Sequence, residues 1–125
     1  MNTTALAFLG DAVYETYVRE RILKTGEFHS DMLHRKAIAY VRAEAQAKIL
    51  RRLFPELTAE EEALAKRARN RKSASKPKNA DPVDYKLATA FEALIGWLSL
   101  SGQKERMEEL ILKAMEIAEE KDGEC

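Results

Sequence analysis

The sequence predicts an all-α fold, and three observations lead to this prediction. Ala, Leu, Glu, Lys and Arg dominate the 125 residues, as in helical proteins, whereas Gly and Pro are scarce. No segment reads convincingly as a strand, and several segments carry helix start or stop signals. About a third of the residues are charged and nearly half are hydrophobic, which is typical of a globular chain. We therefore expect residues 1–125 to form a single domain with one core.

The first half of the chain is expected to be helical up to Pro55. A helix over about 4–24 is followed by Gly26, a suitable C-terminal stop. Ser30 is expected to cap a second helix, which continues through an apolar and basic stretch to Pro55. A break near 40–42 would divide that stretch into two helices.

The next helix begins with a capping box and leads into basic sequence. Thr58 and Glu61 have the T-x-x-E spacing in which each side chain bonds the other residue's backbone N–H. The segment "SASKPKNAD" is rich in Ser, Pro and Asn, which favour loops. We therefore expect a basic loop at about 70–80.

Two further helices complete the prediction. Asp81 followed by Pro82 is a cap with proline at the first helical position. That helix should reach about residue 100 and stop at Gly102, and the last should span roughly 103–121. The total is five or six helices.

Cysteine usage and the apolar segments bear on location. The single cysteine, Cys125, allows no internal disulfide, which fits a reducing cytoplasm. The N-terminus has no basic region, and Asp11 interrupts its apolar stretch, unlike a secretory signal. The apolar segment around Glu92 is short and carries a central charge, which argues against a membrane span. The expected location is cytoplasmic, without a membrane partner.

Two carboxylates stand alone in apolar helices. Asp11 is the only charged residue between positions 3 and 14, and Glu92 the only one between 87 and 103. A buried carboxylate without a partner is costly. Two such groups on packed helices could hold a hard divalent cation, and Mg²⁺ needs only one or two protein carboxylates. Such an ion can activate water for phosphodiester hydrolysis. The alternative is that Arg, Lys or backbone caps satisfy both acids.

Two motifs resemble a known family. "ALAFLGDAVYE" is similar to the ribonuclease III signature, which usually reads close to "LEFLGDAVL". "AFEALIGWLSLSG" is similar to that family's second acidic motif, usually "DxFEALIGAIYLD". Their order and their spacing, 81 residues from Asp11 to Glu92, also fit. Within the family the chain resembles mini ribonuclease III, the short form without a double-stranded-RNA-binding domain, over most of residues 5–100.

The resemblance implies both an activity and its residues. It implies a ribonuclease III endonuclease-domain-like helical fold, with Asp11 and Glu92 as metal-binding catalytic carboxylates and Mg²⁺ as the cofactor. It implies a homodimer whose two sites each cut one strand of double-stranded RNA. It further implies maturation of the 23S (large-subunit) ribosomal RNA precursor, helped by a large-subunit ribosomal protein.

Two of the four carboxylates usual in the larger family are absent. Ala7 stands where a glutamate is usual, and Thr89 where an aspartate is usual. The mini members resemble this reduced pattern, which leaves open whether one or two metals bind. Glu15, one turn from Asp11, is a further candidate metal ligand, and its alternative is an ion pair with Arg19.

A run of positive charge is the candidate RNA-binding segment. Residues 66–78 carry seven basic side chains and no acidic one, although the chain's formal net charge is zero. Phosphate contacts from Arg and Lys dominate nucleic-acid affinity. The alternative is a solvated loop. The predicted RNA-binding residues are Lys66, Arg67, Arg69, Arg71, Lys72, Lys76 and Lys78.

Two alternatives remain open. The absent carboxylates favour a non-catalytic, ribosome-associated RNA-binding module, whereas the retained Asp11 and Glu92 favour the enzyme. The apolar stripe of the first helix belongs either to the core or, in part, to a dimer seam. This stripe comprises Leu6, Leu9, Val13 and Tyr17.

Overall fold

The structure, a computed structural model, describes residues 2–71 and 81–120. Within these ranges it contains helices and no strand, which confirms the predicted all-α fold. A short 3-10 helix, Phe54–Glu56, follows the third α-helix. The α-helices are α1 (Thr3–Leu23), α2 (Ser30–Val41), α3 (Ala43–Leu53), α4 (Ala59–Asn70), α5 (Pro82–Leu100) and α6 (Lys104–Glu119).

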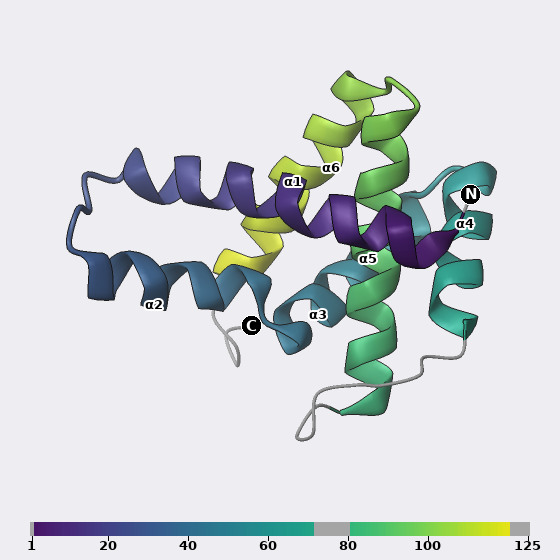
Figure 1. The fold of residues 1–125 in the computed structure, drawn as a ribbon, viewed down its shortest axis with the longest axis horizontal. Helices are drawn as coiled ribbons and strands as arrows, with labels where there is room; N and C mark the ends of the chain where they lie inside the picture. The colour runs from purple at the N-terminus through teal and green to yellow at the C-terminus, as the bar shows by residue number, and fades with distance from the viewer. Residues whose placement is uncertain (1, 72–80, 121–125) are drawn as a thin grey trace.

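Helix α5 is the centre of the molecule. Its contacts with α1 are the most extensive of any helix pair, and α3, α4 and α6 also pack against it. Helices α1 and α2 form a long hairpin that projects away from α5 (Figure 1). Across 2–71 and 81–120, no helix combines the length and the hydropathy that a membrane span needs.

Several helix boundaries follow the predicted caps. Thr58 and Glu61 form the reciprocal capping box at the start of α4. The Asp81 carboxylate accepts hydrogen bonds from the first backbone N–H groups of α5. The prediction for Ser30 is wrong, because it is the first residue of α2 and the N-cap is His29, which makes no side-chain cap bond. Asn2 caps α1, a role that was not predicted.

The expected break near 40–42 separates α2 from α3. Arg42 has an extended backbone (φ −64°, ψ 154°) between two helical segments. The break ends α2 at Val41, whose carbonyl oxygen accepts a hydrogen bond from the side-chain amide of Gln46. A side chain of α3 thus ties down the end of α2.

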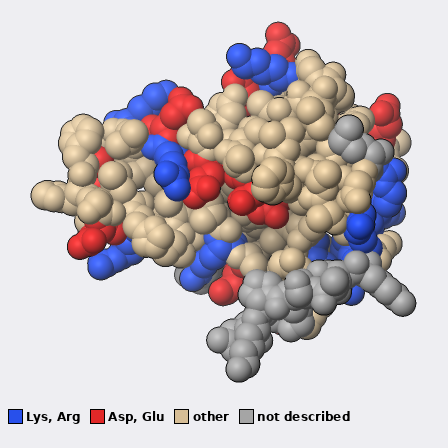
Figure 2. Space-filling view, viewed as in Figure 1, with Lys and Arg blue, Asp and Glu red and all other residues tan. Residues whose placement is uncertain are grey.

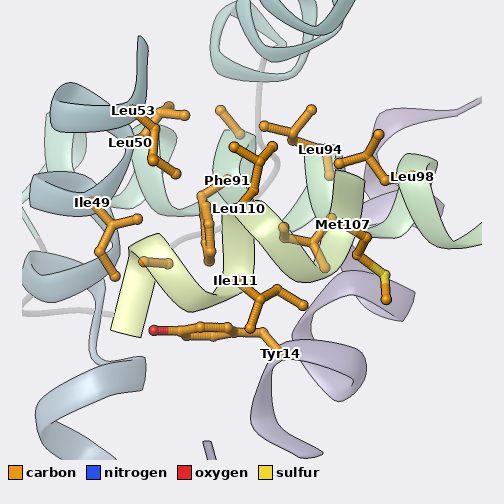
Figure 3. Packing of buried hydrophobic residues seen from close by; sticks show 14 of the residues in the cluster. Tyr14, Ile49, Leu50, Leu53, Phe91, Leu94, Leu98, Met107, Leu110 and Ile111 are labelled. Atoms are coloured by element: carbon orange, nitrogen blue, oxygen red, sulfur yellow. The ribbon is translucent and has the colours of Figure 1, made fainter. Parts of the chain in front are cut away.

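The core lies where α1, α3, α5 and α6 meet (Figure 3). Tyr14 and Phe91 are fully buried, and their rings meet edge to face at 5.0 Å. The Tyr14 hydroxyl donates to the Tyr40 carbonyl oxygen, and burial raises its pKa far above the usual value. In the predicted stripe of α1, Leu6 is fully in the core, whereas Leu9, Val13 and Tyr17 are half-buried.

A buried ion pair joins α4 to α6. The Glu61 carboxylate, 2% exposed, accepts two hydrogen bonds from Arg106 at 3.0 and 2.9 Å. Arg106 also donates to the Glu56 carbonyl oxygen at 3.0 Å. The guanidinium lowers the pKa of Glu61 and keeps it ionised despite its burial.

We expect Arg106→Ala to lower the free energy of unfolding by about 3 kcal/mol, because Glu61 would remain buried without its partner. Urea unfolding followed by circular dichroism measures this change. The matched control is Lys113→Ala, which removes an exposed pair with Glu56 and should cost far less, because solvent screens exposed pairs. If the two variants lost the same free energy of unfolding, the buried pair would not stabilise the fold more than the exposed pair.

Candidate active site

Two glycines allow α1 and α5 to cross in backbone contact. A Cβ built on Gly10 would lie 1.7 Å from the backbone oxygen of Glu92, and one on Gly96 would lie 1.9 Å from that of Leu6. The two glycines also face each other, since a Cβ on Gly10 would lie 2.9 Å from the backbone nitrogen of Gly96. The small residues beside the acidic positions therefore bring the two helices together.

The crossing places Asp11 and Glu92 side by side. Asp11 follows Gly10 directly, and the backbone of Glu92 lies against Gly10. Their carboxyl groups are close enough to share a hydrogen bond. Burial, together with the charge of Asp11, raises the pKa of Glu92 to about 8. The expectation of two buried acids is only partly right, because Glu92 is half-buried and Asp11 is exposed.

A cation fits this pair better than a basic side chain does. Within 2–71 and 81–120, no Lys or Arg forms an ion pair with Asp11 or Glu92. Two adjacent carboxylates repel each other, and a divalent cation between them would remove that repulsion. Three potential His, Cys, Asp or Glu ligands never come together in the described part of the chain. The pair therefore suits an ion such as Mg²⁺, which completes its shell with water and phosphate oxygens.

The other positions considered for metal binding, 7, 15 and 89, offer no carboxylate that is free of other contacts. Glu15 pairs with Arg19 at 3.0 Å, as in the alternative considered for it, and its role as a ligand stays a prediction. Ala7 is buried. Thr89 donates its hydroxyl hydrogen to the Tyr85 carbonyl oxygen one turn earlier. None of these contacts adds a third acid to the pair of Asp11 and Glu92.

Gln46 of α3 is a site residue that the sequence reasoning missed. It is 1% exposed, and its side-chain amide lies close enough to the Glu92 carboxyl to lower the pKa of that group. The sequence did hold a signal for it. Gln46 shares one helical face with core residues three, four and seven positions later, so it is a lone polar group on an apolar face. Those core residues are Ile49, Leu50 and Leu53.

The predicted RNA-binding residues divide between a helix and a segment outside the described ranges. Lys66, Arg67 and Arg69 lie on the last turns of α4, and Arg71 follows directly. Arg67 and Arg71 line a surface hollow beside the start of α1. The remaining predicted residues, Lys72, Lys76 and Lys78, lie outside the described residues.

Local contacts distinguish the described basic residues from one another. Lys66 pairs with Glu62 at 3.2 Å and lies over the Phe54 ring. Arg71 donates to the Asn2 side-chain oxygen at 2.8 Å. In Figure 2, acidic side chains gather near the middle of the face shown, and basic ones gather at its right edge over α4.

Comparison with known proteins gives consistent matches. The family model of the ribonuclease III domain matches residues 4–103. Mini-ribonuclease 3 of Symbiobacterium thermophilum is 49% identical, covering 91% of this chain and 88% of the relative. Mini-ribonuclease 3 of Brevibacillus brevis is 50% identical over 94% of this chain and 88% of its own. A crystal structure of a Fusobacterium nucleatum protein superposes with a TM-score of 0.82 at 32% identity, covering 92% of each chain.

Proposed function

Because the chain belongs to the ribonuclease III family and is a ribonuclease III-type endoribonuclease, we propose that it cleaves double-stranded RNA with Mg²⁺ held by Asp11 and Glu92. The observation that carries this proposal is the adjacency of the two carboxylates at the α1–α5 crossing. The resemblance predicted from the motifs is confirmed by the match to the ribonuclease III domain and by the similarity to the mini-ribonucleases 3.

The residues of the site would divide the chemistry as follows. When bound, Mg²⁺ would supply a water activated for attack and positive charge for the phosphate oxygens. Asp11, which is exposed, would face the RNA backbone, and Glu92 would fix the site against the core. Arg67 and Arg71 would hold phosphates and so keep the duplex against the carboxylates. Holding the phosphodiester in a fixed position beside the catalytic groups lowers the barrier to the reaction.

The decisive experiment is an incubation with duplex RNA. The RNA is the stem of a large-subunit ribosomal RNA precursor, with magnesium in one sample and EDTA in the other. We expect defined cuts in both strands with magnesium and none with EDTA. A duplex left intact in both samples would instead support the ribosome-associated binding module, which the alanine and threonine at positions 7 and 89 favour.

The finer biological setting is also a proposal. The names of the relatives suit a short ribonuclease III. We place it in the cytoplasm, acting on the 23S ribosomal RNA precursor with help from a large-subunit ribosomal protein. Faster cleavage of the precursor after addition of purified large-subunit proteins would support that help.

A homodimer is proposed because α1 exposes an apolar side chain near the site. Phe8 is 84% exposed and lies one turn before Asp11 on the same helix. We infer that this ring is covered by a second copy of the chain. A two-fold axis there would present one site to each strand of a duplex.

We expect Phe8→Glu to convert the dimer to a monomer, because a charge cannot be buried in an apolar seam without a partner. Sedimentation velocity at micromolar protein measures this. Leu112→Glu, at a 48% exposed position on α6, is the control and should remain dimeric. A wild-type protein that sediments as a monomer while cutting both strands would exclude the proposed dimer.

Replacing both Arg67 and Arg71 by Ala should weaken RNA binding and flatten its dependence on salt. Each lost phosphate contact lowers the slope of log affinity against log salt by about 1. Fluorescence anisotropy of one labelled duplex at several salt concentrations gives that slope. Lys113→Ala on α6 is the charge-matched control. An unchanged slope in the double variant would mean that the basic end of α4 is solvated surface.

A further inference from the structure

Gln46 brings a buried and incompletely satisfied amide to the site. Its side chain is 1% exposed, and its amide nitrogen Nε2 donates to the Val41 carbonyl oxygen at 3.0 Å. A carbonyl oxygen can only accept, so this bond fixes which end of the amide is the nitrogen. The oxygen Oε1 is then buried with no hydrogen-bond partner among the described residues, the only side-chain atom there of which this is true.

An unpaired buried amide oxygen needs a reason. Leaving such an acceptor without a donor costs about 1–3 kcal/mol, and buried polar groups are therefore nearly always paired. The same side chain contacts the Glu92 carboxyl, which adjoins Asp11. The amide therefore lies beside the two carboxylates, where a hydrated cation would bring water O–H groups.

We propose that Gln46 is a positioning residue for the cation, its Oε1 accepting a hydrogen bond from a water bound to the ion at Asp11 and Glu92. This inference rests on the proposed function. Magnesium keeps several waters, and hydrogen bonds to its outer shell orient them. In this chain positions 7 and 89 offer no carboxylates for that task. The neutral Oε1 of Gln46 therefore orients the metal-bound water in place of a further carboxylate.

The fold holds Gln46 ready for this role. The break at Arg42 leaves the Val41 carbonyl oxygen without a helical hydrogen bond from α3. The side-chain Nε2 of Gln46 donates a hydrogen bond to it instead. The oxygen is thereby turned away from Val41. Because α3 packs against α5, the fold brings the amide to Glu92.

The test measures metal binding directly, without RNA. Free Mn²⁺ is followed by electron paramagnetic resonance during titration of wild type, Gln46→Leu, Gln46→Glu and Asp11→Asn. Ile49→Val, three residues further along α3 and fully buried, is the control for a mild core defect. We expect Gln46→Leu to weaken binding about 10- to 100-fold, as loss of an outer-shell partner does. Gln46→Glu keeps an acceptor and should bind at least as tightly as wild type.

Cleavage kinetics supply the second measurement. In Gln46→Leu the magnesium concentration for half-maximal rate should rise, while kcat at saturating magnesium recovers. Unchanged Mn²⁺ affinity in Gln46→Leu would overturn the inference alone, as would a Gln46→Glu variant that binds as weakly as Gln46→Leu. If Gln46→Leu does not fold, Gln46→Met takes its place with the same expectation. A wild type that binds no Mn²⁺ would overturn both the inference and the proposed metal site.

Discussion

Gly10→Ala will destabilise the protein by at least about 3 kcal/mol, the upper end of what overpacking a core costs. The added methyl group would sit 1.7 Å from the backbone oxygen of Glu92. No flexible side chain can move aside, because both contacting surfaces are helix backbone. Helices α1 and α5 would have to separate, and their interface is the most extensive in the molecule.

Thermal and urea unfolding measure this effect, and Gly102→Ala is the matched control. Gly102 has a positive φ of 74° with nothing within 4 Å of an added Cβ, so only the backbone penalty of about 1–2 kcal/mol applies. Gly96→Ala should resemble Gly10→Ala, since its Cβ would meet the Leu6 backbone oxygen at 1.9 Å. A Gly10→Ala variant no less stable than Gly102→Ala would show that the helices do not cross this closely.

The same substitution connects stability with activity. Any separation of α1 from α5 that accommodates a methyl group at position 10 also moves Asp11 away from Glu92. Cleavage should therefore be lost in whatever fraction of Gly10→Ala remains folded. The glycines thus set the distance between the carboxylates, which neither acid could set on its own.

Short-range features of the fold could be predicted from the sequence because their causes are local. The capping box of Thr58 and Glu61 and the cap of Asp81 are hydrogen bonds within three residues, so the letters themselves specify them. The cap predicted at Ser30 is off by one residue. The backbone of His29 has the extended conformation of the N-cap, and Ser30 is already helical.

The candidate site could be predicted only in part because it is assembled from three helices. Asp11 and Glu92 stand out as lone charges in apolar sequence, and the resemblance to the family assigned them a role. The burial of each could not be read from such a pattern, since the neighbours of Asp11 along α1 say nothing of what covers it. Gln46 meets Glu92 through tertiary packing and Val41 through a break between helices, so its role required coordinates.

Asp11→Asn and Glu92→Gln should leave a folded protein that is inactive. In the absence of metal, Glu92 binds a proton more tightly in the folded protein than in the unfolded chain, where its pKa is near the ordinary 4.5. Its ionisation therefore lowers stability as the pH rises from 4.5 through about 8. In EDTA at alkaline pH, Glu92→Gln should thus unfold at a temperature equal to or above that of wild type. That result would separate a catalytic defect from a folding defect.

The activity itself should fall about 1,000-fold in each variant, because losing a ligand removes roughly 4 kcal/mol of charge stabilisation in the transition state. Each change removes a negative charge and no basic one, so duplex RNA should bind as in wild type or slightly more tightly. Single-turnover cleavage at saturating protein, with binding measured by anisotropy in calcium, keeps the two effects apart. Glu20→Gln is the matched control, because Glu20 is an exposed acid of the same helix, nine positions from Asp11. Near-normal turnover in Asp11→Asn or Glu92→Gln would mean that the cation, and with it the cleavage site, lies elsewhere on the molecule.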